Sequence, residues 1–256
     1  MDQIVVHGTD TDVSPYDSGS YASSTAYLTG MAVVKTCETL KKKILHKAAK
    51  YLECSEDELE FDGRRVYRVS CEEDGSRKEI TIKDIGNRIM CSNEDALQAT
   101  ESHSSPVSPP PFMAGAAEVE VDTETGKVEL LRFVAAVDCG TPLNINLARV
   151  QTEGGLAQGI GMALYEDVTY SDTGRVYENS FMQYKVPSRL DVGRVQVEFE
   201  SSFEPTGPFG AKSIGEVVIN TPSPAIANAV YNAVGVRIRE LPITAEKVFK
   251  GMNGLD

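Results

Sequence analysis

The chain of 256 residues is poor in the side chains that most often bind metals directly. It has only three histidines, His7, His46 and His103, and they lie far apart in the sequence. This spacing argues against a histidine metal site and against a Ser–His–Asp triad. The five cysteines are scattered and never form a CxxC motif. That pattern excludes a small disulfide scaffold and a local zinc or iron–sulfur site.

Basic residues and long apolar runs are also scarce. The chain has 25 Lys and Arg against 38 Asp and Glu, a net charge of −13. A nucleic acid or an anionic membrane needs a basic face, so neither is an expected partner. No apolar run approaches the roughly 20 residues that cross a bilayer, and the opening MDQIVVHGTD lacks signal-peptide features. We therefore expect a cytoplasmic protein.

Hydrophobic residues make up 41% of the chain, which is enough for a packed core. Helical spacing predicts a long helix from a Ser/Thr cap at 23–25 to about Glu53, and shorter helices at 82–90, 144–164 and 224–234. Strands are expected at 4–6, around the Asp62-Gly63 turn, on both sides of Thr125-Gly126 and at 195–200. The fold class is α+β, with helices packed on mixed sheets. We expect a first subdomain at 1–115, incomplete at its N-terminus, and a second at 116–256.

Three segments of small residues are candidates for binding. Ser23 to Thr25 begin the long helix, where free N–H groups suit a phosphate or another anion, although an ordinary Ser/Thr cap is favoured on this feature alone. The second segment, 151–161, places Gly154, Gly155, Gly159 and Gly161 in one helix, each at a cost of about 1 kcal/mol relative to alanine. A ligand near Gln158 and a closely packed helix explain these glycines equally well.

The third segment, 207–216, is a Gly/Pro loop that ends at Glu216. A carboxylate at the rim of a buried site can act as a general base. A solvated loop glutamate is the commoner case. Lys212 does not belong to a phosphate-binding loop, because the GxxxxGK spacing is absent.

Four segments occur in an order that is found in a known family and span nearly the whole chain. They read TDTDVSPYDSGSYASS, VDCGTPLNINLARVQTEGGLAQGIGMALYED, GPFGAKSIGEVVINTPSPAIANAV and RIRELPIT. The chain resembles the C-terminal molybdenum-cofactor-binding region of the xanthine dehydrogenase/aldehyde oxidase family of molybdenum hydroxylases. The third segment is similar to the GAKGxGE signature of that family, with Ser213 in place of its second glycine.

The resemblance implies a molybdopterin cofactor, expected in a dinucleotide form, that itself holds the molybdenum. It implies that Glu216 is the catalytic base, which deprotonates a hydroxyl group on molybdenum while the cofactor accepts a hydride. The residues that the resemblance places at the cofactor are Ala22, Ser23, Ser24, Thr25, Ala26, Gln158 and Gly159. Phe209 and Lys212 are expected on the substrate side of Glu216, because they lie close to it in the sequence. The implied reaction is hydroxylation of an N-heterocycle, such as a purine (xanthine) or nicotinate, or oxidation of an aldehyde, with water as the oxygen source.

Several parts of the family pattern are not in this sequence: a GQG segment, an arginine-bearing FRGxG-like segment, iron–sulfur motifs and a flavin domain. We expect companion chains or domains to carry the other half of the molybdenum site, the iron–sulfur clusters and FAD. The chain is then part of a split or longer subunit, inactive alone and able to self-associate through its uncovered half-site. Two alternatives stay open: a non-catalytic assembly module of the same fold, and an unrelated α+β phosphate-binding protein that uses only the helix start.

Overall fold

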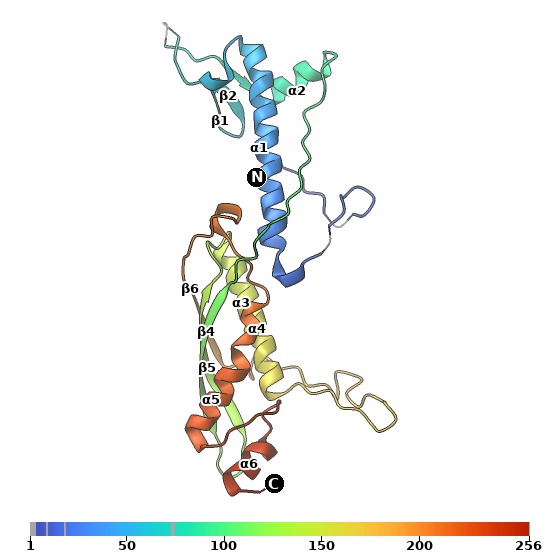
Figure 1. Cartoon of the computed structure of the whole chain (residues 1–256), viewed down its shortest axis with the longest axis vertical. Helices are drawn as coiled ribbons and strands as arrows, with labels where there is room; N and C mark the ends of the chain where they lie inside the picture. The colour runs from blue at the N-terminus through green and yellow to red at the C-terminus, as the bar shows by residue number, and fades with distance from the viewer. Residues whose placement is uncertain (1–3, 9, 18, 73–74, 256) are drawn as a thin grey trace. The chain divides into compact units, whose positions relative to one another are not determined.

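The computed structural model describes residues 4–8, 10–17, 19–72 and 75–255 (Figure 1). The chain divides into two compact units. The larger unit combines Met1–Tyr27 with Ser108–Asp256, and the smaller unit is Leu28–Val107. This division differs from the expected 1–115 and 116–256, because the N-terminal segment contacts the C-terminal part. Ser23 bonds to Glu216, and Tyr27 bonds to Thr206 through the hydroxyl groups, 2.6 Å apart.

The smaller unit is built on α1 (Thr25–Leu52), whose first turn belongs to the larger unit. An antiparallel sheet of β1 (Leu59–Phe61), β2 (Arg65–Arg68) and β3 (Glu79–Thr81) packs with α1 and α2 (Ile82–Met90). The core residues of this unit are Ile44, Ala48, Ala49, Leu59, Val66, Ile80, Ile85 and Ile89. The long helix, the Asp62-Gly63 hairpin and the helix at 82–90 agree with the sequence predictions.

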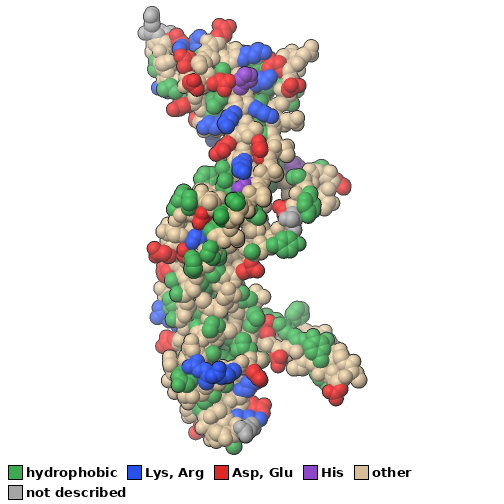
Figure 2. Space-filling model, in the orientation of Figure 1, with side chains coloured by type: hydrophobic (Ala, Val, Ile, Leu, Met, Phe, Trp, Pro, Cys, Tyr) green, Lys and Arg blue, Asp and Glu red, His purple; other side chains and the backbone are tan. Residues whose placement is uncertain are grey.

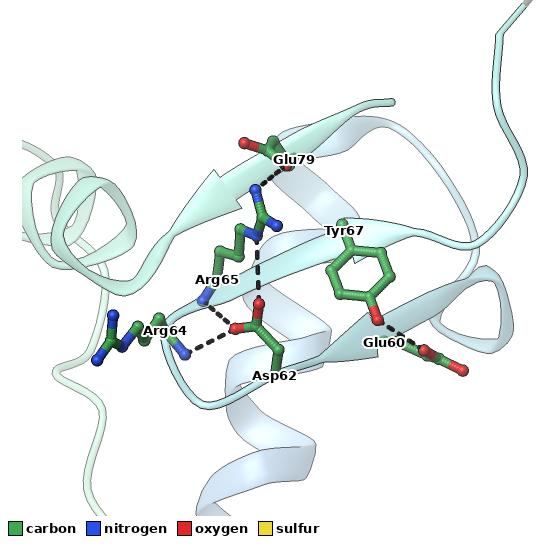
Figure 3. A network of polar contacts seen from close by, with 6 residues as sticks. All are labelled: Glu60, Asp62, Arg64, Arg65, Tyr67 and Glu79. Carbon is green, nitrogen blue, oxygen red and sulfur yellow. Dashed lines mark hydrogen bonds and ion pairs between the residues drawn. The ribbon is translucent and has the colours of Figure 1, made fainter. Parts of the chain in front are cut away.

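A polar network holds the β1–β2 turn in place (Figure 3). The Asp62 carboxylate accepts the backbone N–H groups of Arg65 and Arg64, each at 2.9 Å. These two bonds, the first from Arg65, hold the pKa of Asp62 below its usual range. The Arg65 guanidinium also bonds to Glu79 at 2.8 Å, which ties the turn to β3.

The ion pairs of Glu94 with two lysines should make the stability of this unit sensitive to acid. Its carboxylate accepts hydrogen bonds from Lys47 at 2.5 Å and Lys50 at 2.7 Å, which lower its pKa from 4.5 to about 2. Because the folded-state pKa is depressed, the contact stabilises the fold above pH 4.5 and loses its effect as the pH falls toward 2. Urea unfolding of wild type and Glu94→Gln should therefore differ most above about pH 5 and converge near pH 2. A difference that does not change with pH would contradict this assignment.

The larger unit contains a mixed sheet in the order β4 (Phe112–Val121), β5 (Val128–Asp138), β6 (Arg194–Phe199). β4 and β5 are antiparallel, whereas β5 and β6 are parallel. Helices α3 (Ile145–Leu164), α4 (Val217–Asn220) and α5 (Pro222–Val234) contact one another, and α5 packs along β4 (Figure 1). The fully buried side chains of this core include Phe133, Val137, Leu156, Ile160, Val197, Ile226 and Val230.

Three local predictions need correction. Ile4 to Val6 form no strand and are exposed, because none of the described strands pairs with them. β4 begins at Phe112 rather than near Ala116, because Phe112 pairs with Asp138 at the end of β5. The last helix, α6 (Ala245–Asn253), was not expected, although the side chain of Thr244 caps it by accepting the N–H of Lys247.

The segment 166–193 joins α3 to β6 largely through turns. It exposes large apolar side chains, with Phe181 86% and Leu190 93% accessible, and Figure 2 shows hydrophobic side chains at its surface. Hydrogen bonds from Tyr184 to Glu166 and from Thr169 to Glu178 give it internal order. Among the helices in the described ranges, none is long and apolar enough to cross a membrane.

Candidate functional site

The Gly/Pro loop that ends at Glu216 is fastened to the end of β5 by backbone contacts. Gly140 and Ala211 form an isolated β-bridge. The Thr141 N–H donates to the carbonyl of Gly210 at 2.8 Å, and the Lys212 N–H donates to the carbonyl of Cys139 at 2.8 Å. The loop therefore adds a short ladder beyond the sheet, and its last residues lead directly into α4.

The helix start at 22–26 contacts this loop. The Ser23 hydroxyl donates to Oε2 of Glu216 at 3.2 Å. Gly215 allows the approach, because a Cβ there would lie 2.7 Å from the Ser23 oxygen. Ala22 and Ser23 have φ of 49° and 54°, the left-handed region that costs non-glycine residues energy. Such strain is concentrated at functional sites, and here it occurs at the residue whose hydroxyl donates to Glu216.

A cavity of about 450 Å³ lies between the helix start, the N-terminal half of α3 and the loop. Its lining combines hydroxyl and amide groups with small and apolar side chains. The lining residues are Ser20, Ser23, Ala26, Cys139, Thr141, Pro142, Leu143, Asn144, Leu147, Ala148, Gln151, Ala211, Lys212, Ile214 and Gly215. Glu216 is exposed beside Gly215, so its carboxylate lies at the rim.

The glycines of α3 pack against other helices. Gly155 faces the side chain of Val218 in α4, and Gly159 faces Pro222 in α5. No atom lies within 4 Å of the position that a Gly154 Cβ would take. Of the two explanations that the sequence left open, helix packing accounts for Gly155 and Gly159.

Gln158 is exposed and does not line the cavity, whereas Gln151 on the same helix does. Seven residues return a helix to nearly the same face but about 10 Å further along its axis. Gln151 and Gln158 therefore lie on nearly the same face of α3. The sequence contains no signal for which end of the helix reaches the loop, and Gln151 was not among the expected residues.

Lys212 lines the cavity, and its ammonium group is paired. Its Nζ lies 2.8 Å from Oδ2 of Asp138, and its side chain is only 10% exposed. Phe209 is 73% exposed, has φ of 52° and is not part of the cavity lining. The structure therefore brings Lys212, but not Phe209, to the cavity that Glu216 borders.

Asp138 is the centre of a small polar cluster. Besides Lys212 it accepts the hydroxyl of Ser202 at 2.5 Å and the N–H of Gly140 at 2.9 Å. Burial raises the pKa of Asp138, but these hydrogen bonds outweigh burial and bring the pKa below its usual range. The carboxylate is therefore charged at neutral pH.

The cavity lacks the ligand set of a protein-bound metal. Over the ranges that the structure describes, no group of three or more His, Cys, Asp or Glu side chains is placed to hold a metal ion. Cys139 lines the cavity, but burial raises the pKa of its thiol and keeps it protonated, whereas metals bind thiolate. The described residues of this chain therefore do not by themselves offer such a ligand set.

Comparison with known proteins identifies the family. Residues 1–193 match the family described as a molybdopterin cofactor-binding domain. The chain belongs to this family. The match confirms the resemblance to the molybdenum-binding region of molybdenum hydroxylases, and with it the cofactor, molybdopterin.

Relatives and solved structures extend the similarity over nearly the whole chain, including Glu216. The chain is 34% identical over 254 residues to a probable hypoxanthine oxidase, XdhD, of Escherichia coli K12, covering 98% of this chain and 26% of that protein. It is 31% identical to the gamma subunit of the 6-hydroxypseudooxynicotine dehydrogenase complex of Paenarthrobacter nicotinovorans, covering 98% of this chain and 32% of that subunit.

Two solved structures share the fold. The reconstituted CO dehydrogenase from Oligotropha carboxidovorans superposes with a TM-score of 0.83 at 28% identity, covering 95% of this chain and 31% of that one. The quinoline 2-oxidoreductase of Pseudomonas putida 86 gives 0.83 at 25% identity, covering 96% and 32%. These matches confirm the α+β fold class. The chain spans between a quarter and a third of the length of these proteins.

Proposed function

We propose that this chain forms one wall of the molybdopterin site of a molybdenum hydroxylase and supplies its catalytic base, Glu216. The hydrogen bond from Ser23 to Glu216 carries the proposal. It joins the segment expected to hold the cofactor to the residue expected to perform proton transfer, at the rim of one cavity.

The residues of the cavity suit a pterin cofactor. Ser20, Ser23, Thr141 and Gln151 offer hydroxyl and amide groups for a pterin ring and its phosphate. The start of α1 at Thr25 and Ala26 is a helix N-terminus, where backbone N–H groups favour an anion. We propose that 22–26 and Gln151 hold the cofactor, and that Gln158 and Gly159 lie further along the same face of α3.

When bound, the cofactor supplies the two-electron redox step and delivers an oxygen atom that derives from water. Glu216 accepts the proton that this chemistry releases, since a carboxylate within hydrogen-bond reach is a competent base. Ser23 orients the Glu216 carboxylate through its hydroxyl group. Leu147, Ala148 and Ile214 contribute apolar surface beside it, which limits access of bulk water.

The proposed substrate is an N-heterocycle of the purine or nicotine type, with an aldehyde as the second class. The names of the relatives, a hypoxanthine oxidase and a 6-hydroxypseudooxynicotine dehydrogenase subunit, support this choice. Because those proteins are three to four times longer, we propose that further chain segments complete the molybdenum site. Companion chains or domains then carry the iron–sulfur clusters and FAD, and the cofactor is a dinucleotide form.

Ser213 does not favour the alternative of a non-catalytic module. Its φ is not positive, so the loop does not require a glycine at this position. The serine that replaces the family glycine is therefore compatible with the loop that presents Glu216.

Metal and pterin analysis of the chain, purified with the proteins that accompany it in its source, tests the proposal. We expect about one molybdenum and one pterin per complex, together with segments that complete the site. Molybdenum-free protein without a partner, from cells that load other molybdenum enzymes, would contradict the proposal. Phosphate binding without pterin would favour the helix start as a simple anion site.

A further inference from the structure

The side chains of Asp138, Lys212 and Ser202, with the N–H of Gly140, form a cluster that we call the Asp138 anchor. Each of its contacts is short: Lys212 Nζ lies 2.8 Å, the Ser202 oxygen 2.5 Å and the Gly140 nitrogen 2.9 Å from the Asp138 carboxylate. The anchor joins the end of β5, the chain just after β6 and the loop that leads to Glu216.

The Glu216 side chain has few polar contacts within the described residues. It is exposed, and its carboxylate has one side-chain hydrogen bond within the described residues, from Ser23 at 3.2 Å. On its C-terminal side the chain is fixed by Val218, which is fully buried and packs against Gly155. On its N-terminal side the nearest buried side chain with polar partners is Lys212, four residues earlier.

We propose that the Asp138 anchor positions the catalytic loop and thereby sets where the Glu216 carboxylate stands. This inference rests on the proposed role of Glu216 as the base. The backbone bonds at Gly210 to Lys212 place the start of this segment, and the side-chain bond of Lys212 to Asp138 adds a second restraint there. A misplacement of the Glu216 carboxylate by about 1 Å can cost on the order of 10²-fold in rate.

The geometry separates this role from substrate binding. The charge of Lys212 is neutralised by Asp138, and its side chain is 10% exposed. Its backbone N–H is also bonded, to the carbonyl of Cys139 at 2.8 Å. Lys212 is therefore a positioning residue, and its ammonium charge is already paired with Asp138 rather than available to a substrate.

Lys212→Met and Lys212→Arg in the full chain, assembled with its partners, test the proposal. For Lys212→Met we expect kcat to fall roughly 10- to 100-fold, with KM within about threefold and an unchanged molybdenum content. Lys212→Arg keeps the charge and should retain kcat within about fivefold. Lys250→Met removes a lysine from an exposed pair with Glu246 and serves as the matched control. A raised KM at constant kcat, or equal losses for Met and Arg, would overturn the proposal.

Hydrogen exchange gives a readout that does not depend on turnover. In Lys212→Met the amides of 211–216 should exchange at least tenfold faster, while those of β5 stay protected. Ser202→Ala removes one donor to Asp138 and should give a smaller increase in the exchange rate of these amides. This variant keeps the test valid if Lys212→Met fails to fold. Unchanged protection of 211–216 in both variants refutes the anchor. Retained turnover in Glu216→Gln would instead refute the proposed function. It would not change what the exchange rates show about the Asp138 anchor.

Discussion

Glu216→Gln in the assembled enzyme is expected to lower turnover by about 10²- to 10⁴-fold, the range that a general base contributes. Glutamine has the same shape and can still accept the Ser23 hydrogen bond, but it cannot take up a proton at neutral pH. The residues proposed to contact the cofactor are others, so molybdenum and pterin contents should match those of the wild type. Steady-state kinetics with metal analysis of the same samples make the measurement.

Glu124→Gln is the matched control for this experiment. Glu124 is exposed in the turn between β4 and β5, and the same change there should leave turnover within about twofold. Turnover of Glu216→Gln within about tenfold of wild type would show that another group is the base. A loss of molybdenum together with activity would show that Glu216 contributes to holding the cofactor.

Adjacent glycines in α3 should respond in opposite directions to alanine. A Cβ at Gly155 would lie 2.2 Å from a methyl carbon of Val218, which is fully buried, so Gly155→Ala should lower the free energy of unfolding by about 1–3 kcal/mol. Gly154 is exposed with no atom near its Cβ position, so Gly154→Ala should raise that free energy by up to about 1 kcal/mol. Urea unfolding followed by circular dichroism measures both.

The same pair of variants tests whether the contact between α3 and α4 affects the position of Glu216. Val218 lies in α4, which starts directly after Glu216. Pushing Val218 away from α3 should therefore displace Glu216 and lower kcat in Gly155→Ala, while Gly154→Ala leaves kcat unchanged. Equal unfolding free energies for the two variants would show that α3 and α4 separate at little cost. That result would remove the argument that helix packing explains Gly155.

Local patterns in the sequence determined most of the individual elements. The apolar spacing and hydroxylated start of α1, the Asp62-Gly63 turn and the strands on both sides of Thr125-Gly126 depend on neighbours in the chain, which a sequence displays directly. The order of the segments also sufficed to recognise the family. Ile4 to Val6 shows the limit of this approach, because an apolar run forms a strand only where another strand can pair with it.

Only the tertiary structure decided how the candidate site is assembled. Ser23 and Glu216 are 193 positions apart, and no local pattern reports a hydrogen bond between them. The same holds for Lys212. The sequence gives no sign that its charge is paired, but in the fold it bonds to Asp138, 74 positions away. Gln151 rather than Gln158 reaches the cavity because the loop meets the start of α3 and not its middle. Sequence periodicity identifies which face of a helix is buried. The position along the helix axis at which another segment contacts it depends on long-range packing, which only the folded chain contains.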